Sequence, residues 1–326
     1  MSADCAKLTV YFGESDRVAG ALLSDLLFDL FEKRQVLASS LLRGVEGFGV
    51  EHQLRTDRFL TLSEDLPLAA VAVAEPAVID ALLPEVSSVL RGGLITTERA
   101  TLLRGALAGV EMHDPVKLTL YLGRDEPYVE VVGRLRRAGL AGATVLLGVD
   151  GTVHGQRRRA RFFSRNSGVP LLVIGVGTAD AVRRGLGELD GLVREPVATL
   201  ERVRICKRDG ELLARPDETP AAGWQKLMVY VSEQAQHDGH PVYVQLIRRL
   251  REQRAGGATS VRGIWGFSGE HEPHGDRLFR LRRRVPVVTT IVDEPDAIRR
   301  WFDIVDELTG ESGLVTCEAV PEALRR

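Results

Sequence analysis

The chain has 326 residues, 44% of them hydrophobic and 27% charged, with a formal net charge of −2. These values are typical of a globular protein of two or three domains, and the near-neutral charge argues against bulk nucleic-acid binding. No apolar run approaches the ~18 residues that cross a bilayer, and the N-terminus lacks the pattern of a signal peptide. Three widely spaced cysteines fit reduced thiols, so we expect a cytoplasmic protein that binds no membrane.

One pattern of strands and helices occurs three times. Each copy opens with a strand of alternating apolar and polar residues, the period of a half-buried strand. These strands begin about 110 residues apart, at residues 7–11, 117–121 and 226–230. A helix follows, with apolar residues at i, i+3, i+4 and i+7 in residues 128–135 and 243–250. Residues 22–31 of copy 1 are more uniformly apolar, so we expect that helix to be buried on more than one side.

The second half of each copy is equally regular. A second strand runs into a glycine cluster, in residues 38–49, 142–155 and 257–269. A proline then opens a buried third strand, at Pro67, Pro170 and Pro286, where no ladder donor is lost. Pro76 and Pro295 suit the first turn of a second helix, and Thr178 can cap that helix in copy 2. A short last strand closes each copy, in residues 93–97, 197–203 and 313–317.

The order β-α-β-β-α-β, found three times, is typical of the ferredoxin-like split βαβ arrangement. The sequence therefore predicts an α+β fold with three tandem ferredoxin-like (βαββαβ) domains, each able to bury a modest core. Their predicted boundaries are 1–105, 106–208 and 209–326, with the second domain divergent.

Several of these landmarks together resemble a known family. They are the run GVEGFG after an apolar strand, an arginine-bearing loop, residues 62–67 and the run GLITTERATLL. This combination resembles the uncharacterised DUF190 family, also called UPF0166, which is similar to the PII signalling proteins. The resemblance covers copies 1 and 3 almost fully. Copy 2 matches in pattern, but Thr152 stands where the other copies have Phe48 and Phe267.

The resemblance implies a PII-like unit that assembles as a symmetric trimer. PII proteins bind adenine nucleotides in clefts between subunits and dock on partner proteins through a long loop after the second strand. Three copies in one chain then predict an intrachain pseudo-trimer, since a head-to-tail ring of three closes on itself. Tethering would raise the effective concentration of the copies to roughly millimolar. The alternative is that copies associate between chains.

The glycine clusters and loop arginines are the candidate ligand-binding residues. Glycine lets backbone N–H groups approach a phosphate closely, although it also shapes bulges and twists. An arginine nine residues before each proline could clamp a phosphate or carboxylate, or only form a salt bridge. Together with the turns before the last strand, the candidates are Gly44, Gly47, Phe48, Gly49, Arg58, Arg91, Gly92, Gly93, Arg161, Gly263, Gly266, Phe267, Arg277, Gly310 and Gly313.

Copy 3 also carries two histidine pairs, which could ligate zinc or another transition metal or be ordinary surface residues: His237, His240, His271 and His274. The sequence contains no convincing nucleophile, acid–base pair or redox motif, so we expect no enzyme. We expect instead a PII-like sensor or adaptor with a small anionic ligand, for which an adenine nucleotide is the candidate, and a partner protein docked on its loops. The alternatives are a structural or protein-interaction module without ligand, and a metal-binding protein.

Overall fold

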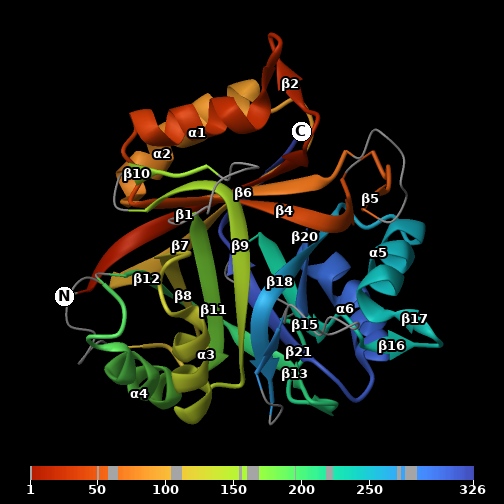
Figure 1. Ribbon diagram of the computed structural model, residues 1–326. Coiled ribbons are helices and arrows are strands. Elements are labelled where there is room, and N and C mark those ends of the chain that lie inside the picture. The colour runs from red at the N-terminus through yellow and green to blue at the C-terminus, as the bar shows by residue number, and fades with distance from the viewer. Residues whose placement is uncertain are drawn as a thin grey trace.

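The computed structural model of the chain is described for residues 2–49, 51–57, 65–103, 112–153, 156–159, 169–194, 196–217, 223–269, 273–275 and 285–326. These residues form a mixed α/β structure with six helices and one large sheet (Figure 1). The predicted order β-α-β-β-α-β occurs in each of the three copies. No helix in this part of the chain is both long and apolar enough to cross a membrane.

The long elements follow one another in the same order in the three copies. Copy 1 consists of β1 (Ser2–Gly13), α1 (Leu23–Lys33), β4 (Ala38–Phe48), β6 (Pro67–Ala74), α2 (Pro76–Val89) and β7 (Leu94–Leu103). Copy 2 consists of β8 (Val116–Gly123), α3 (Tyr128–Arg137), β9 (Gly142–Val153), β11 (Pro170–Gly177), α4 (Ala179–Leu189) and β12 (Val197–Arg202). Copy 3 consists of β15 (Trp224–Ser232), α5 (Val242–Glu252), β18 (Ala258–Ser268), β20 (Pro286–Asp293), α6 (Pro295–Thr309) and β21 (Leu314–Val320).

Short strands, which the sequence patterns did not predict, extend this common plan. A hairpin precedes the first helix in copy 1, β2 (Arg17–Val18) with β3 (Ala21–Leu22), and in copy 3, β16 (Gln236–His237) with β17 (His240–Pro241). In copy 2, residues 124–127 lead directly from β8 into α3. The other short strands follow the second or the last strand of a copy: β5 (Arg55–Thr56), β10 (Gln156–Arg157), β13 (Arg204–Arg208), β14 (Glu211–Leu212), β19 (His274–Gly275) and β22 (Glu322–Arg325).

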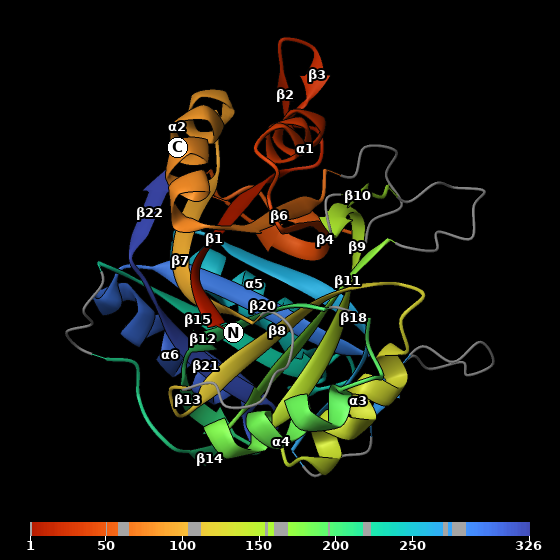
Figure 2. The same ribbon diagram turned by 90° about the vertical axis from the view of Figure 1, so that its left-hand side faces the viewer.

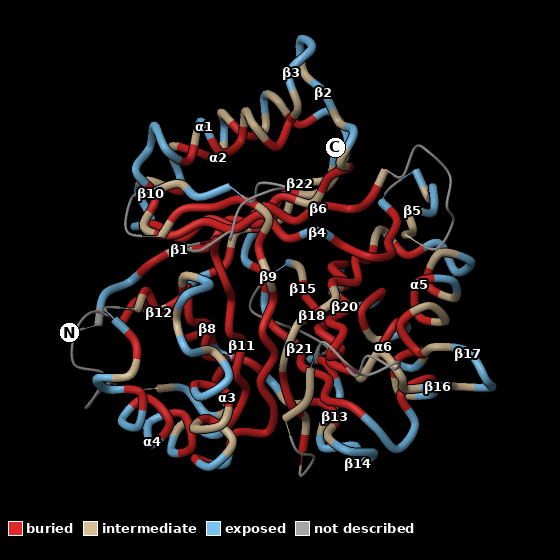
Figure 3. The backbone as a smooth tube through the Cα atoms, in the orientation of Figure 1, coloured by how far each residue is buried: buried red, intermediate tan, exposed pale blue. Residues whose placement is uncertain are grey.

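The four long strands of each copy form an antiparallel sheet in one order. The second strand is followed by the third, the first and the last, giving β4-β6-β1-β7, β9-β11-β8-β12 and β18-β20-β15-β21. The helices of each copy lie on the outer face of its sheet, as Figures 1 and 2 show together. The inner faces meet at the centre of the molecule, where the strands are almost entirely buried (Figure 3).

The helices bury the faces that their spacing predicted. In α3, Val131, Val132 and Leu135 are buried and Tyr128 is partly buried, and all four apolar residues of the α5 stripe are buried. The Thr178 side chain accepts a hydrogen bond from the N–H of Ala181 at 3.2 Å, which confirms the predicted cap of α4. The expectation for α1 was wrong, because Leu26 and Leu30 stay partly exposed and only one face of that helix is fully buried.

The copies are joined by strand pairing that repeats around a closed cycle. One half of each second strand pairs with the next copy and the other half with the previous one, through β4–β9, β9–β18 and β18–β4. The end of each last strand, or the segment that follows it, also crosses the boundary between two copies, which we call a seam. The pairs are β7 with β12, β13 with β21, and β22 with β7. Each copy therefore contacts both of the others through backbone hydrogen bonds.

Side chains cross the same seams, so the cores of the copies are interlocked. Val45 and Phe48 of copy 1 lie in the core that copy 3 builds around α5 and α6. Phe267 of copy 3 lies in the core that copy 2 builds around α3 and α4. A fourth core, between the inner faces of the sheets, draws residues from all three copies.

Candidate functional site: a cleft between copies 1 and 3

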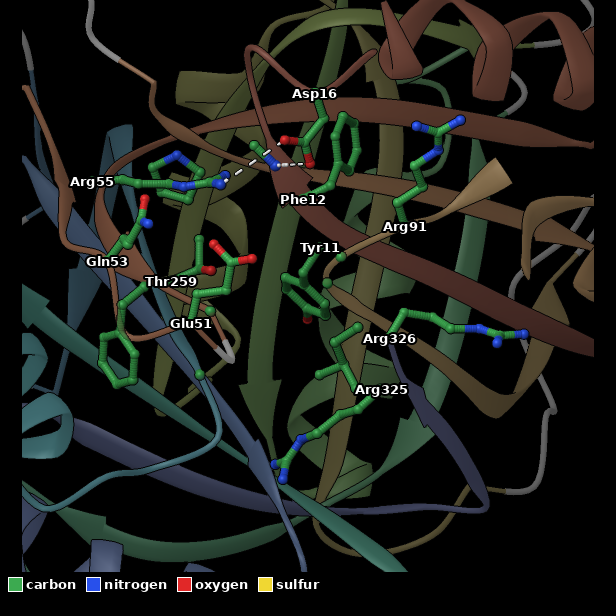
Figure 4. A pocket seen from close by; sticks show the side chains of 18 of the residues that line it. Tyr11, Phe12, Asp16, Glu51, Gln53, Arg55, Arg91, Thr259, Arg325 and Arg326 are labelled. Carbon is green, nitrogen blue, oxygen red and sulfur yellow. Dashed lines mark hydrogen bonds and ion pairs between the residues drawn. The ribbon is translucent and has the colours of Figure 1, made fainter. Parts of the chain in front are cut away.

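A cavity of about 510 Å³ opens at the seam between copies 1 and 3. Copy 1 contributes the end of β1, the β2–β3 hairpin, the chain after β4 and the turn before β7. Copy 3 contributes the start of β18, part of β20 and the end of the chain after β22. Figure 4 shows side chains from both copies converging on this space, with Tyr11 between Arg55 on one side and Arg91 and Arg326 on the other in this view.

The copy 1 wall combines aromatic rings with an ordered ion pair. Arg55 pairs with Asp65 at 3.1 Å and lies 3.9 Å from Asp16, whose carboxylate also accepts the N–H of Gly13 at 2.8 Å. Burial raises the pKa of Asp16 despite that hydrogen bond and the nearby guanidinium. Burial also raises the pKa of Tyr11 to about 12, so its hydroxyl stays protonated near neutral pH. A side chain at Gly13 would collide with the Arg55 guanidinium, so glycine there leaves room for this arrangement.

The copy 3 wall holds Arg325 in a fixed position. Its guanidinium donates to Asp293 at 2.8 Å and lies 4.7 Å from the centre of the Trp224 ring. Asp293 also accepts bonds from Trp301 at 2.9 Å and from the N–H of Gly256 at 3.2 Å. Burial alone would raise the pKa of Asp293, but these bonds outweigh burial and lower it. Asp293 is therefore a charged anchor for an arginine that faces the cleft.

Two further arginines meet at the turn before β7. The backbone of Arg326 exchanges two hydrogen bonds with that of Gly93, at 3.0 and 3.2 Å, and this pairing closes the seam. The Arg326 side chain donates to Ser87 Oγ at 2.6 Å. Arg91 is exposed and makes no hydrogen bond or ion pair with any residue that the structure describes. Among the described residues, Arg91 is thus the one arginine of the cleft whose guanidinium is not already held by a partner.

Five of the predicted ligand residues line this cleft: Phe48, Gly49, Arg91, Gly92 and Gly93. Side chains at Gly49 and Gly92 would meet no atom within 4 Å, whereas one at Gly93 would meet the Tyr11 carbonyl oxygen at 2.2 Å. Sequence reasoning missed the remaining arginines of the cleft: Arg17, Arg55, Arg325 and Arg326. Arg17 and Arg55 belong to short strands without a detectable pattern, and Arg325 reaches the cleft only because β22 crosses to copy 1.

The other glycines of the clusters do not line this cleft, because they lie inside strands at the seams. A Cβ on Gly44 would lie 2.7 Å from Pro67 Cγ, and one on Gly47 would lie 2.7 Å from the Ala258 carbonyl oxygen. Gly263 and Gly266 are placed in the same way, against Pro286 and the backbone of β9. Phe267 is buried in the core of copy 2. These glycines let two backbones and a proline ring approach closely.

The remaining candidate ligand residues and histidines that the structure describes do not line this cleft. Gly310 and Gly313, with φ of +52° and +90°, form the turn between α6 and β21. His237 and His240 face each other across the β16–β17 hairpin, and His274 pairs with Gly266. None of these three histidines belongs to a group of three or more potential metal ligands within the described residues. Arg58, Arg161, Arg277 and His271 lie outside the residues that the structure describes.

Within the described residues, three carboxylates lie close enough together to share a metal ion: Glu98, Glu201 and Glu318, at the centre of the molecule. Each carboxylate is ion-paired with two lysines, one from its own copy and one from another, in a closed ring. Five of the six pairs measure 2.5 to 3.0 Å, and the sixth joins Lys7 to Glu201. All six side chains are almost fully buried. Because the three positive charges already match the three negative ones, we assign this ring a structural role.

Comparison with known proteins identifies the family. The sequence model of DUF190, described as "Uncharacterized ACR", matches residues 5–102, 116–205 and 224–321, so the chain belongs to this family and carries three copies of it. A UPF0166 protein of Aquifex aeolicus is 37% identical over 95 residues, covering 29% of this chain and 88% of that protein. The UPF0166 protein MJ1524 of Methanocaldococcus jannaschii is 28% identical over 89 residues, covering 27% of this chain and 82% of that protein.

Proposed function

We propose that this chain is a non-enzymatic, PII-like sensor or adaptor whose cleft between copies 1 and 3 binds a small anionic ligand. An adenine nucleotide is the ligand class to test first. The observation that carries the proposal is the gathering of five arginines from two copies around a cavity of about 510 Å³. Small-molecule sites usually enclose ~300–1,000 Å³ with apolar walls and a few polar groups. Guanidinium groups bind phosphate and carboxylate bidentately, which favours an anion.

We also propose that each copy is a ferredoxin-like unit and that the chain is a covalent pseudo-trimer. The common strand order within the copies and the closed cycle of strand pairing between them support this. The curated relatives support it as well, because each is matched over most of its length by a single copy. A tethered ring brings the copies together without any need for association between chains.

In this proposal the ligand acts on the loop between β4 and β6. Glu51, Gln53 and Arg55, near the start of that loop, line the cleft. A bound anion would draw Arg55 away from Asp65 and Asp16, and so change the loop surface offered to a partner protein. Such a change of ion-pair partners, caused by the charge of a ligand, is how a binding site without catalytic groups can signal.

Calorimetric titration with ATP, ADP, AMP and inorganic phosphate tests the function. We expect saturable binding of an adenine nucleotide, weakened at least about tenfold by Arg91→Glu, because that variant reverses a charge facing the ligand. Arg202→Glu is the matched control. Arg202 is exposed, belongs to copy 2 and has no partner among the described residues, so binding should be unchanged. If none of the four compounds binds the wild-type chain, the proposed ligand class is wrong.

A further inference from the structure

The backbone pairing that borders this cleft recurs between copies 3 and 2, and it shows which residues correspond. We call the corresponding place at that seam the second cleft. The N–H of Asp209 donates to the Gly313 carbonyl at 2.9 Å, as the N–H of Arg326 donates to Gly93. Arg208 is paired with Leu314, as Arg325 is with Leu94. Asp209, at the seam between copies 3 and 2, therefore corresponds to Arg326 at the seam between copies 1 and 3.

The arginines of the first cleft are almost all absent from the second. His274 pairs with Gly266 as Arg55 pairs with Gly47, and Gln236 replaces Arg17 in the hairpin. Glu311, two residues before Gly313, replaces Arg91. In the order Arg17, Arg55, Arg91, Arg325 and Arg326, the five arginines of the first cleft correspond to Gln236, His274, Glu311, Arg208 and Asp209 in the second. Two cations have become anions and only one arginine remains.

The carboxylate of Asp209 lies close to the end of β18 at this seam. A Cβ on Gly269, just after β18, would lie 2.0 Å from Asp209 Oδ2, so this carboxylate already lies against the end of the strand. The remaining arginine, Arg208, lies 3.5 Å from the same carboxylate, which offsets its charge. Glu311 is exposed at the turn, where Arg91 is exposed in the first cleft.

We propose that the two seams differ in selectivity: the cleft between copies 1 and 3 accepts an anionic ligand, and Asp209 and Glu311 exclude the same ligand from the corresponding place between copies 3 and 2. Like charges placed together are a common way to reject a ligand. This inference rests on the proposed function and adds to it that tethering has made the copies functionally unequal.

A matched pair of cleft-filling variants tests the inference, with ATP as the probe and the number of bound ATP molecules per chain as the readout. Gly92→Trp fills the first cleft at a position where a Cβ meets no neighbour, and should lower the number by one. Ser312→Trp makes the corresponding change in the second cleft, at an exposed residue, and should leave the number unchanged. A loss of one site in Ser312→Trp would overturn the inference while leaving the proposed function intact. Failure of the wild-type chain to bind ATP would overturn both.

A gain-of-site variant tests the role of the two acidic residues. Asp209 has φ of +47°, a conformation that asparagine tolerates, so Asp209→Asn combined with Glu311→Arg removes the repulsion with little backbone strain. We expect one additional ATP per chain. Glu188→Arg with Asp190→Asn applies the same change in net charge at exposed residues of copy 2, and should add none. An unchanged number of sites in a double variant that melts like the wild type would show that these residues do not exclude the ligand.

Discussion

Gly47 is confined by two different copies at once. A Cβ at this position would lie 2.7 Å from the Ala258 carbonyl oxygen of copy 3 and 3.0 Å from Cγ of Pro67, which opens the next strand of its own copy. The proline and the glycine thus form one contact, and the same contact recurs between Pro286 and Gly266. This explains why a glycine cluster and a strand-opening proline accompany each other in the sequence.

We predict that Gly47→Ala destabilises the chain by about 1–3 kcal/mol, the usual cost of overpacking a filled interior. Gly49→Ala is the matched control, because its Cβ would meet nothing within 4 Å. Chemical denaturation of the two variants beside the wild type gives the comparison. Equal stability of Gly47→Ala and Gly49→Ala would mean that the seam tolerates the methyl group.

A second residue-scale prediction concerns Asp293, which anchors Arg325, Trp301 and the N–H of Gly256. Asp293→Asn removes the charge, so it should cost about 1.5–3 kcal/mol, the range for hydrogen bonds to charged groups. Asp296→Asn, at a well-exposed carboxylate in the first turn of α6, should change stability by less than about 0.5 kcal/mol. Thermal melting of both variants is the measurement, and equal melting temperatures would argue against the anchor.

At the scale of the strand, the first strands carry a polar face that ends up buried. Lys7, Lys117 and Lys226 are only 7%, 2% and 3% exposed, because they point into the ring formed with Glu98, Glu201 and Glu318. A buried ion pair is expensive to break, since removing one partner leaves an unmatched charge away from water. The ring therefore fixes how the three sheets meet.

We predict that Glu98→Gln destabilises the chain by about 3–5 kcal/mol at neutral pH, because Lys7 and Lys226 each lose a partner. Burial alone would raise the pKa of Glu98, but Lys226, Lys7 and Lys117 outweigh it and hold that pKa well below its usual range. A carboxylate with a lowered pKa stabilises the fold above its unfolded-state pKa of about 4.3 and loses that contribution as the pH falls through the lower, folded-state pKa.

The difference in stability between wild type and Glu98→Gln should accordingly be full near pH 7 and shrink once the pH falls below about 4. Urea denaturation across this range measures it. The exposed Glu188→Gln serves as control and should show no such pH dependence. A difference that grew on acidification would contradict the account of the ring.

These strands also show how far sequence alone could go. Alternation in residues 7–11 correctly predicted a strand, and the apolar stripes correctly predicted which faces of α3 and α5 are buried. The same alternation indicated a half-buried strand, since nothing local shows that other copies cover the polar face. For the same reason we interpreted Gly44 and Gly263 as ligand-binding glycines, although each packs against the proline of its own copy and a backbone oxygen of another copy. The cleft could be predicted only where its residues lie in a repeated turn, such as Arg91 to Gly93.

At the scale of the whole molecule, the hydrophobic core of each copy includes side chains from another copy. Val45 and Phe48 of copy 1 fill space in copy 3, and Phe267 of copy 3 fills space in copy 2. We predict that residues 1–105 expressed alone do not form a folded monomer, because these apolar side chains and the edge of β4 lose their cover. Size-exclusion chromatography with circular dichroism checks this against the full chain. A monomeric, cooperatively melting fragment would contradict the prediction.

The ring of six charges has a consequence for how such a triplicated gene can change over time. Each lysine shares its partners between its own repeat and another, so a mutation in one repeat cannot be compensated there alone. The turns and hairpins of the three repeats are not bound in this way and differ between the repeats, as Glu311 and Asp209 illustrate. At the central ring, by contrast, a change in one repeat has to be matched by a change in another.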